Sequence, residues 1–372
     1  MRILQLGKFW PIRGGVEKVM WDLARGLVSR GIECDMLCAI LPEDAGGKRR
    51  CKKIEFGPAG SCICLPAWKK VAATMISPAM IFWLHRHRKE YDIIHIHHPD
   101  PMACLALRLS GFRGKVVLHW HSDILKQKGL LKFYRSLQSW LIHRADRILG
   151  TTPVYVQQSP WLKDVQDKVS YLPIGIEGAE RPVPGLQKET VTVFALGRLV
   201  EYKGFRYLVE AASCLPDNYR IEIGGTGPLE QELLTQIYDS GLQEKVSLLG
   251  WLSDEEVREH YAGCDLYALS SIMKTEAFAI VQIEAMSYGK PVVATHIPGS
   301  GVDWVNSDGE SGINVAVSEP EALAKAIVEI TCDRETYARY CEGARRRYEE
   351  MFTYGKMIDN CLKIYGEVYE AE

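Results

Sequence analysis

Short apolar segments alternate with segments of helical periodicity along most of the chain. In the first half, the apolar segments predict β-strands at residues 2–7, 34–40, 91–97, 115–121, 146–152 and 169–176. Between them, apolar residues recur three or four positions apart, as helices require, for example at Val16, Val19, Met20, Leu23 and Leu27. Continuously apolar strands separated by helices favour a parallel sheet that is covered on both faces.

Residues 177–189 interrupt this alternation. The segment EGAERPVPGLQKE has two prolines, two glycines and no apolar period, so it is interpreted as a linker. The alternation then resumes, with strands predicted at residues 191–197, 220–225, 245–251, 264–270, 291–297 and 313–317. The tail at residues 319–369 is predicted to be helical.

The predicted fold is α/β, with two doubly wound Rossmann-like domains facing across a cleft. Residues 1–180 form the first predicted domain and residues 181–352 the second. Residues 353–372 are expected to form a helix that packs back on the first domain.

The composition is that of a soluble globular protein, because 47% of the 372 residues are hydrophobic and 25% are charged. No window reaches the ~18 unbroken apolar residues of a spanning helix. The segment MRILQLGKFW lacks the features of a signal peptide, so a cytoplasmic protein is expected. The eleven cysteines are interpreted as reduced thiols, most of them buried, and the spacing of Cys62 and Cys64 is poor for zinc.

Charge is distributed unevenly, with a net +11 over residues 1–180 and −13 over residues 181–372. Two domains with different partners would account for this asymmetry, and so would a drift in charge between two solvated surfaces.

Two glutamates follow the strand predicted at residues 264–270. Glu276 is expected in the loop after the strand and Glu284 on the next helix, with free backbone N–H groups between them in AFAIV. In the same half, Arg198 and Lys203 flank a predicted strand-to-helix turn. Two cations at that turn form a site for a diphosphate.

The first half has two weaker signals. Gly14 and Gly15 join the first strand to the first helix, where glycines allow a phosphate or sugar to approach the backbone. His121 and Asp123 lie where another strand ends, and His119 shares a sheet face with His121. Together with His95, His97 and His98 these histidines raise the question of a metal, but no Glu or Cys is spaced to close a site, so none is predicted.

Taken together, these motifs resemble the family 4 (GT4) retaining glycosyltransferases of the GT-B fold. The resemblance rests on the Gly-Gly loop, HSD, GR…K, GGTGPL, GWLSDEEV and the Glu-x7-Glu segment, all in family order. The stretches WHSDILKQK and GSGVDWVNSDGESG are similar to bacterial enzymes that assemble O-antigen or other polysaccharides, several of which are mannosyltransferases.

The resemblance implies roles in the second, donor-binding domain. Arg198 and Lys203 would hold the diphosphate of a nucleotide-sugar. Glu284 would bond the ribose, and Glu276 would bond the donor sugar as a catalytic residue. Backbone groups of the segment after Glu276 would assist, namely those of Phe278, Ala279, Ile280 and Val281.

Further roles are implied around these. In the first, acceptor-side domain, Gly14 and Gly15 would approach the diphosphate, His121 would lie beside the transferred sugar, and Asp123 would be on the acceptor side. The loop that would meet the base is Gly250, Trp251 and Leu252. The family usually has glycine where this chain has Ala279, and if that position needs a positive φ, alanine would shift the fit of the donor.

The resemblance further implies transfer of a hexose, with GDP-mannose as the leading donor, to a growing lipid-linked bacterial glycan. Neither a cofactor nor an essential metal is expected, and no nucleic-acid partner. A UDP-hexose or UDP-HexNAc donor remains open, as does a non-catalytic scaffold that binds nucleotide-sugars. A dinucleotide-dependent oxidoreductase is disfavoured because the glycine fingerprint is missing, and a nucleotide-sugar epimerase would need no acceptor.

A lipid-linked acceptor would require contact with the inner face of the membrane. Residues 66–89 and 125–144 mix basic residues with aromatic and aliphatic ones, and both segments are interpreted as helices. An anionic membrane surface is therefore a further expected partner, although two ordinary helices with solvated basic faces fit the same pattern.

Overall fold

The computed structural model describes residues 1–47, 50–71, 74–124, 128–179 and 189–371, and within the fourth range the side chains of residues 128–133 are not described. The chain divides into two compact units. Unit 1 comprises Met1–Ile174 and Gly355–Glu372, and unit 2 comprises Gly175–Tyr354. The expected domain boundary at residues 180 and 181 lies outside the described residues.

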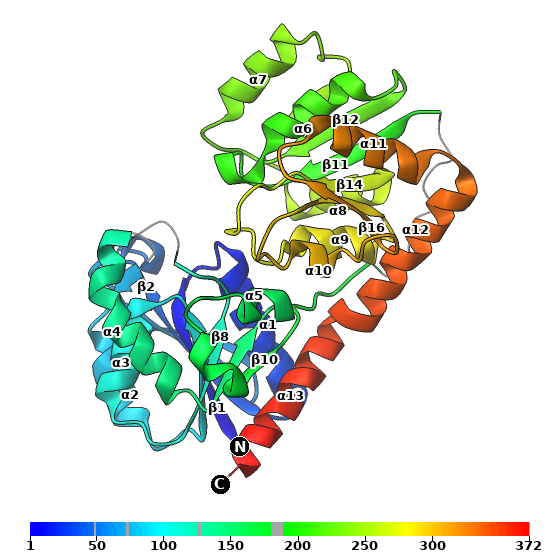
Figure 1. Cartoon of the computed structure of the whole chain (residues 1–372). Helices are drawn as coiled ribbons and strands as arrows, with labels where there is room; N and C mark the ends of the chain where they lie inside the picture. Colours follow the sequence, from blue (N-terminus) through cyan, green and yellow to red (C-terminus); the bar gives the residue numbers. More distant parts are fainter. Residues whose placement is uncertain (48–49, 72–73, 125–127, 180–188, 372) are drawn as a thin grey trace. The chain divides into compact units, whose positions relative to one another are not determined.

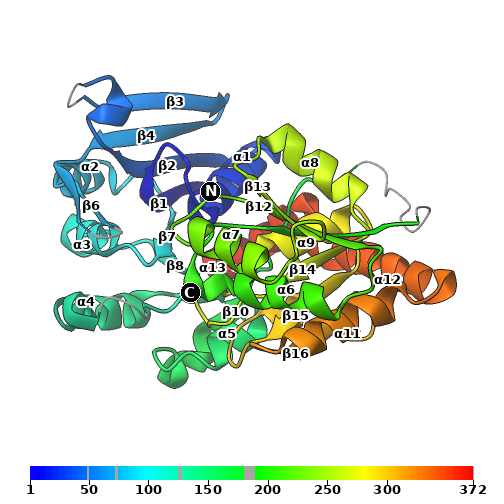
Figure 2. The ribbon, with the colours of Figure 1, turned by 90° about the horizontal axis from the view of Figure 1, so that it is seen from above.

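Unit 1 is built on an eight-stranded sheet with the order β10-β9-β8-β7-β1-β2-β4-β3 (Figures 1 and 2). Its strands are β1 (Arg2–Trp10), β2 (Glu33–Ile40), β3 (Lys52–Gly57), β4 (Gly60–Pro66), β7 (Ile93–His98), β8 (Lys115–Trp120), β9 (Arg147–Gly150) and β10 (Val169–Tyr171). All neighbours pair in parallel except β3, which runs antiparallel to β4 at the edge of the sheet.

Helices connect these strands, as the apolar periodicity predicts. They are α1 (Gly15–Ser29), α2 (Ala79–His87), α3 (Pro101–Ser110), α4 (Lys128–Arg144) and α5 (Pro153–Gln157). The start of α3 shows how the sequence fixes an element. Pro101 occupies its first turn, and the Asp100 carboxylate accepts hydrogen bonds from the backbone N–H groups of Met102 and Ala103.

Unit 2 contains a six-stranded parallel sheet with the order β13-β12-β11-β14-β15-β16. Its strands are β11 (Val191–Leu196), β12 (Tyr219–Gly224), β13 (Val246–Gly250), β14 (Leu266–Leu269), β15 (Val292–His296) and β16 (Gly312–Ala316). Its helices are α6 (Phe205–Ala211), α7 (Glu230–Asp239), α8 (Asp254–Gly263), α9 (Ile280–Ser287), α10 (Val302–Val305), α11 (Pro320–Thr331) and α12 (Arg334–Arg347).

The tail is mostly helical from Pro320 to Glu370, as predicted, with short breaks at residues 332–333 and 353. After α12, a π-helical turn at Tyr348–Phe352 leads into α13 (Tyr354–Glu370). Residues 355–372 are grouped with unit 1, and Gln5 on β1 donates a hydrogen bond of 3.0 Å to the hydroxyl of Tyr365 on α13. Among the described helices, none is both long and apolar enough to span a membrane.

Two expectations are wrong in the stretch between β2 and β7. The strands β3 and β4 were not predicted, and β3 breaks the all-parallel pattern. Residues 66–89 do not form one helix, because β5 (Lys69–Val71) and β6 (Thr74–Ile76) pair as an antiparallel hairpin and only α2 is helical. The β-branched residues Val71, Thr74 and Ile76 favour strands, and Pro78 disfavours helix at the residue before it, so a hairpin replaces a continuous helix here.

Candidate active site

The strand orders place the predicted site residues of each unit at one edge of its sheet. In unit 2 the order reverses between β11 and β14, and in unit 1 it reverses between β1 and β7. In open α/β sheets, ligands bind at such switch points, beyond the carboxyl ends of the strands. The loops after β11 and β14 carry Lys203 and Glu276, the loop after β1 carries Gly14, and His121 directly follows β8.

In unit 2, the structure brings Lys203 and Glu276 into direct contact. The Lys203 Nζ atom lies 2.5 Å from the Glu276 Oε2 atom, and both side chains are almost buried. The same carboxylate oxygen accepts a hydrogen bond of 2.9 Å from the Ser271 hydroxyl. Two groups that the sequence separates by more than seventy positions therefore form one charged pair at the switch point.

Close packing of backbone holds Lys203 in place. Gly204, the next residue, has a φ of +63°, and a Cβ atom there would lie 2.1 Å from the Ser270 carbonyl oxygen. The Ser270 hydroxyl in turn donates to the Lys203 carbonyl oxygen over 3.0 Å. This contact ties the loop after β11 to the end of β14. Arg198 begins the same loop, and its side chain is exposed.

The backbone changes direction sharply where α9 begins. Ala279 is the residue before the helix and has a φ of +60° and a ψ of 78°, in the left-handed region that favours glycine. Phe278 is buried against Phe352, while Ile280 and Val281 are half-buried in the first turn. The first N–H groups of a helix have no partner within it, so this turn offers donors to an anion or a hydroxyl.

Glu284 lies on α9, one turn further along, as expected. Its Oε2 atom accepts a hydrogen bond of 2.8 Å from the hydroxyl of Tyr261 on α8. Tyr261 is fully buried, and burial together with the Glu284 charge raises the pKa of its hydroxyl. The phenol therefore stays protonated and fixes the carboxylate. Sequence reasoning missed Tyr261, because nothing in the sequence links it to Glu284.

The loop after β13 exposes a large aromatic side chain. Gly250 has a φ of +71°, and Trp251 is 74% exposed. Leu252 turns inward, and its side chain fills the space beside Gly224. An exposed indole on a loop at the carboxyl edge of the sheet is suited to stacking against a flat ring.

In unit 1, the end of β1 and the loop that follows it contain a feature that the sequence did not reveal. Gly14 is the residue before α1 and Gly15 its first residue. Lys8, with a φ of +61°, donates from its backbone N–H to the Asp100 carboxylate over 2.5 Å and from Nζ to the Pro99 carbonyl over 2.6 Å. This places the Lys8 amine at the switch point of unit 1, where burial lowers its pKa and the charges of Asp100 and Glu17 oppose that shift.

A row of imidazole rings fills one face of β7 and β8. His97 pairs with His119 in the strand register, and the rings of His95, His97, His119 and His121 stack with centroids 4.0–5.4 Å apart. All four are buried, and burial lowers their pKa values, to about 3 for His119. The rings are therefore neutral at pH 7.

A chain of hydrogen bonds orients His121 within this row. His121 Nε2 lies 2.9 Å from His97 Nδ1, and His97 Nε2 lies 2.8 Å from the Gln5 side-chain oxygen. Gln5 then reaches Tyr365, whose hydroxyl also lies 2.5 Å from His95 Nδ1. Sequence reasoning identified His121 but missed Gln5, His97 and Tyr365 as the groups that hold it.

Asp123 is buried beneath the loop after β8. Its Oδ1 atom accepts hydrogen bonds of 2.9 Å from the Trp120 indole and 2.8 Å from the Ser159 hydroxyl, and its backbone N–H donates to the Tyr155 hydroxyl. These bonds fix the loop that carries His121. Its predicted acceptor-side role stays a prediction.

Ring nitrogens of His97, His119 and His121 lie within 4.8 Å of one another, so these rings could hold a metal ion. Among the described residues, neither ring nitrogen of His119 has a hydrogen-bond partner. No carboxylate belongs to this group.

Comparison with known proteins identifies the family. The model described as Glycosyltransferase Family 4 matches residues 13–177, and the model described as Glycosyl transferases group 1 matches residues 177–347. An O-antigen chain mannosyltransferase C of Escherichia coli is 31% identical over 387 aligned positions, which cover 100% of both chains. This chain is a family 4 glycosyltransferase. The glycosyltransferase also resembles the D-rhamnosyltransferase WbpZ of Pseudomonas aeruginosa, which is 30% identical over 95% of this chain and 92% of that one.

Solved structures show that the glycosyltransferase has the GT-B fold. Sucrose-phosphate synthase from Thermosynechococcus elongatus is similar with a TM-score of 0.76 and 19% identity over 100% of both chains. Anabaena Alr3699/HepE, solved in complex with UDP, is also similar with a TM-score of 0.76 and 19% identity, over 99% of this chain and 100% of that one. The GT-B prediction, with a Rossmann-like sheet in each unit, is thereby confirmed.

Proposed function

We propose that this glycosyltransferase moves mannose from GDP-mannose to a growing lipid-linked bacterial glycan, with retention at the anomeric carbon. The observation that carries the donor and the pathway is the full-length similarity to an O-antigen chain mannosyltransferase. Similarity to phosphatidyl-myo-inositol mannosyltransferases of mycobacteria supports a lipid acceptor. The similar HepE structures with UDP and UDP-glucose support a nucleotide-sugar donor.

The pair of Lys203 and Glu276 supports a donor site that works without an essential metal. When a nucleotide-sugar binds, the ammonium group would turn to the diphosphate and the carboxylate would accept the sugar hydroxyls. Negative charge grows on the diphosphate as the glycosidic bond breaks, and a fixed cation there stabilises the transition state. Arg198, exposed at the start of the same loop, would add a second cation.

His121 would contribute a neutral imidazole beside the transferred sugar. Because burial keeps its pKa well below the ordinary value, the ring carries no charge at pH 7. It would therefore orient the sugar by hydrogen bonding. In front-face retention, the departing phosphate takes the acceptor's proton, so no protein base is needed.

A direct test compares donors. The purified protein is mixed with GDP, UDP, GDP-mannose, GDP-D-rhamnose, UDP-glucose or UDP-GlcNAc, and thermal shift is measured with each ligand and transfer to a lipid-linked acceptor with each donor. We expect GDP and GDP-mannose to give the largest shift, since a ligand at 100 times its Kd stabilises the fold by about 2.7 kcal/mol. Preference for a uridine donor would reject the mannosyl assignment, and donor binding without any transfer would favour the scaffold.

A second test concerns the metal. EDTA in a short assay is expected to leave most of the transfer activity, because the lysine and the backbone N–H groups stabilise the leaving group. Complete loss of activity that one divalent ion restores would reject the metal-free proposal and direct attention to His97, His119 and His121.

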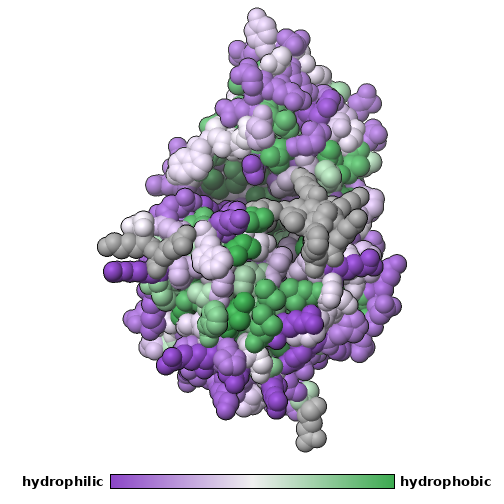
Figure 3. All heavy atoms as spheres, turned by 90° about the vertical axis from the view of Figure 1, so that its left-hand side faces the viewer, coloured by the Kyte–Doolittle hydropathy of each residue, from purple (hydrophilic) through white to green (hydrophobic). Residues whose placement is uncertain are grey.

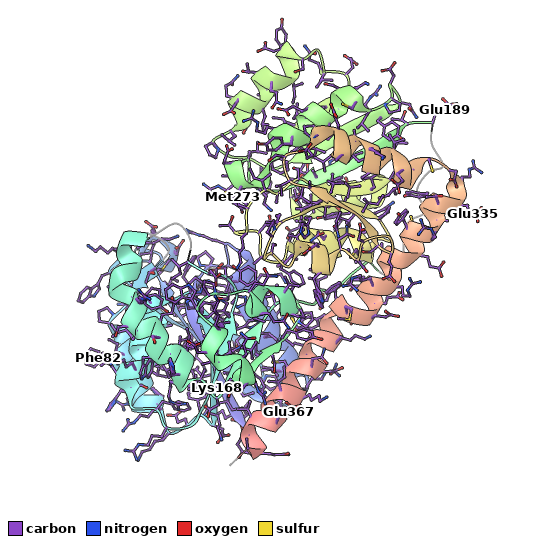
Figure 4. The ribbon with its side chains drawn as sticks, viewed as in Figure 1. Phe82, Lys168, Glu189, Met273, Glu335 and Glu367 are labelled. Atoms are coloured by element: carbon purple, nitrogen blue, oxygen red, sulfur yellow. The ribbon has the colours of Figure 1, made fainter. Side chains whose placement is uncertain are left out.

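Membrane contact belongs to the same proposal, and one face of unit 1 supports it. Helices α2 and α3 lie side by side and expose Phe82 (74%), Leu109 (55%) and Leu105 (37%), next to the exposed cations Arg86 and Arg108. Figure 4 shows Phe82 projecting outward from α2, and Figure 3 shows hydrophobic side chains gathered on this side of the unit. Apolar side chains beside basic ones fit the interface of an anionic bilayer.

Of the second predicted membrane segment, residues 125–127 lie outside the described residues, so the proposal rests on α2 and α3. We expect Phe82→Asp to reduce co-sedimentation with anionic liposomes at low salt. Tyr238→Asp is the matched control, since Tyr238 on α7 of unit 2 is 72% exposed. Equal recovery of the wild-type protein with neutral and anionic liposomes would reject membrane contact.

A further inference from the structure

Three thiols meet inside unit 1, away from the predicted donor residues. The Sγ atoms of Cys38, Cys62 and Cys64 lie 3.5–3.6 Å from one another. Their side chains are buried, at 2%, 0% and 0% exposure. Each sulfur thus has the other two as neighbours at close to van der Waals contact, an arrangement that the glycosyltransferase reaction does not use.

Strand register explains how the three thiols come together. Cys62 and Cys64 are two positions apart on β4, so they point to the same face of the sheet. On the neighbouring strand β2, Cys38 is the register partner of Cys64. The sequence spacing gave no sign of this group, because Cys38 is more than twenty positions away and β4 was not predicted.

The three thiols differ in how readily they ionise. Hydrogen bonds from Cys38 and Cys62, together with the positive charge of Lys52, lower the pKa of the Cys64 thiol, whereas hydrogen bonds within the group and burial raise the pKa values of Cys38 and Cys62. Lys52 lies directly opposite Cys64 in the antiparallel register and is exposed on the edge strand β3. The thiolate is the form of cysteine that binds metals, so a bound metal ion would displace protons from the thiols of this group.

We propose that Cys38, Cys62 and Cys64 form a three-thiolate site for a thiophilic divalent cation, with Zn²⁺ as the occupant. A tetrahedral zinc ion with Zn–S bonds of about 2.3 Å holds its sulfurs ~3.8 Å apart. The three sulfurs need to separate by only ~0.2 Å to reach that geometry. Structural zinc sites include sets of three cysteines and one histidine, so three thiolates would supply three of the four positions of the tetrahedron.

A metal ion held by Cys38 on β2 and by Cys62 and Cys64 on β4 would link the two strands through metal–sulfur bonds, in addition to their hydrophobic packing. Because a metal ion that binds only the folded chain stabilises it, zinc should act as a clamp on this edge of the sheet. The proposal does not depend on the donor, the acceptor or the transfer chemistry. Its test measures metal binding directly, so its failure would leave the proposed function intact.

The test uses the full-length protein, freed of metal by a chelator and kept under a phosphine reductant so that the thiols stay reduced. Cd²⁺ is the spectroscopic probe, since cadmium thiolates absorb in the ultraviolet, and Zn²⁺ is titrated against a chromophoric chelator. We expect one ion per chain, release of protons as the thiols ionise, and a rise in Tm. Absence of the thiolate band and of zinc uptake would overturn the proposal.

Three variants locate the site. Cys38→Ala and Cys64→Ala should each abolish the cadmium thiolate band and the zinc-dependent rise in Tm. Cys34→Ala is the matched control, because Cys34 is buried on the same face of β2 and lies outside the group, and it should bind the metal like the wild type. If Cys34→Ala loses the band as well, or if Cys38→Ala retains it, the three-thiolate site is overturned.

The test remains interpretable if a variant folds poorly. Circular dichroism of each metal-free variant establishes whether it is folded before titration. Cys62→Ser keeps a small polar side chain in place of the third thiol and provides an independent variant, which should bind Cd²⁺ without the full thiolate band. A full band in this variant would overturn the assignment of Cys62 as a ligand.

Discussion

At the residue scale, the contact between Lys203 and Glu276 leads to the sharpest prediction. Glu276→Gln keeps the size of the side chain but removes its charge and replaces one acceptor oxygen by an NH2 donor, so the lysine loses its charged partner and the sugar hydroxyls lose one of two acceptor oxygens. We expect transfer to fall about a hundredfold or more, as for the loss of one strong electrostatic contact in a transition state. Steady-state kinetics with the preferred donor measure the effect.

The control for this variant is Glu201→Gln, which removes an exposed carboxylate two positions from Lys203. It should leave kcat and KM close to the wild-type values. Circular dichroism should show that both variants are folded. Turnover near the wild-type level in Glu276→Gln would remove Glu276 from the catalytic site.

Ala279 gives a second prediction at this scale. Its φ of +60° places an alanine where glycine is favoured, at a cost of about 1–2 kcal/mol. Ala279→Gly should relieve that cost, partly offset by the greater freedom of glycine in the unfolded chain, for a net gain of up to about 1 kcal/mol. Because the residue adjoins the first turn of α9, the KM for the donor should change too.

Ser318→Gly separates the two effects. Ser318 also has a positive φ of 61°, but it lies beyond β16 and belongs to none of the predicted site segments. We expect it to raise the free energy of unfolding without altering the KM. If Ala279→Gly lowers stability in urea unfolding, the left-handed conformation at this residue is wrong.

At the scale of elements, three of them hold His121 in place. Strands β1 and β7 and helix α13 contribute Gln5, His97 and Tyr365 to a chain of hydrogen bonds that ends on His121, the residue directly after β8. Gln5→Leu removes the central link, which should lower stability by about 1–3 kcal/mol through unsatisfied buried groups. It should also lower kcat while leaving the donor KM nearly unchanged, because His121 would lose its orientation.

Gln138→Leu tests whether this effect is specific. Gln138 is also buried and contacts His98, whose ring stacks on Trp120 on the other face of the same strands. Gln138→Leu should lower the free energy of unfolding but leave kcat unchanged. An equal fall in kcat in both variants would mean that general loosening of unit 1, rather than the position of His121, limits turnover.

The elements also show what the sequence could predict. Apolar runs located the strands that form the centre of both sheets, since buried parallel strands have few polar residues. They did not locate β3 to β6, where polar and apolar residues mix at the edge of a sheet and in a hairpin. The pairing of His97 with His119 and of Cys38 with Cys64 depends on strand order, which local sequence does not encode.

In the candidate site, too, the sequence predicted some residues, and the fold was needed to find their partners. Family motifs singled out Lys203, Glu276 and His121, each on a loop or strand end where it was expected. Their partners, such as Ser271 and Tyr261, are ordinary residue types at unremarkable positions, and only the fold brings them close. The sequence indicated only that alanine would matter at position 279 if the backbone there had a positive φ. The structure was needed to show that the φ of Ala279 is positive.

At the scale of the whole molecule, the buried histidines make stability depend on pH. Burial holds the pKa values of five histidines below the ordinary value of 6.5, namely His95, His97, His98, His119 and His121. Between pH 6.5 and the lowered values, the unfolded chain binds protons that the folded chain does not. The contribution that these neutral histidines make to stability is therefore fully present above pH 6.5 and is lost progressively as the pH falls below that value.

The size of the effect can be tested with one ring. Each such histidine makes the free energy of unfolding fall by up to about 1.4 kcal/mol for each pH unit below 6.5. The folded pKa of His119 is about 3, so its contribution to this fall should continue down to that pH. Urea unfolding of the wild-type protein at pH 7.5, 6.5 and 5.5 should show a falling free energy of unfolding. In His119→Leu, the free energy of unfolding should fall less steeply with pH, because one fewer proton is taken up on unfolding. At low pH this variant should unfold at a higher urea concentration than the wild type, since leucine needs neither a proton nor a hydrogen-bond partner. An unchanged free energy of unfolding between pH 7.5 and 5.5 would mean that the imidazoles are accessible to protons in the folded chain, and the neutral His121 that the proposed mechanism requires would then be wrong.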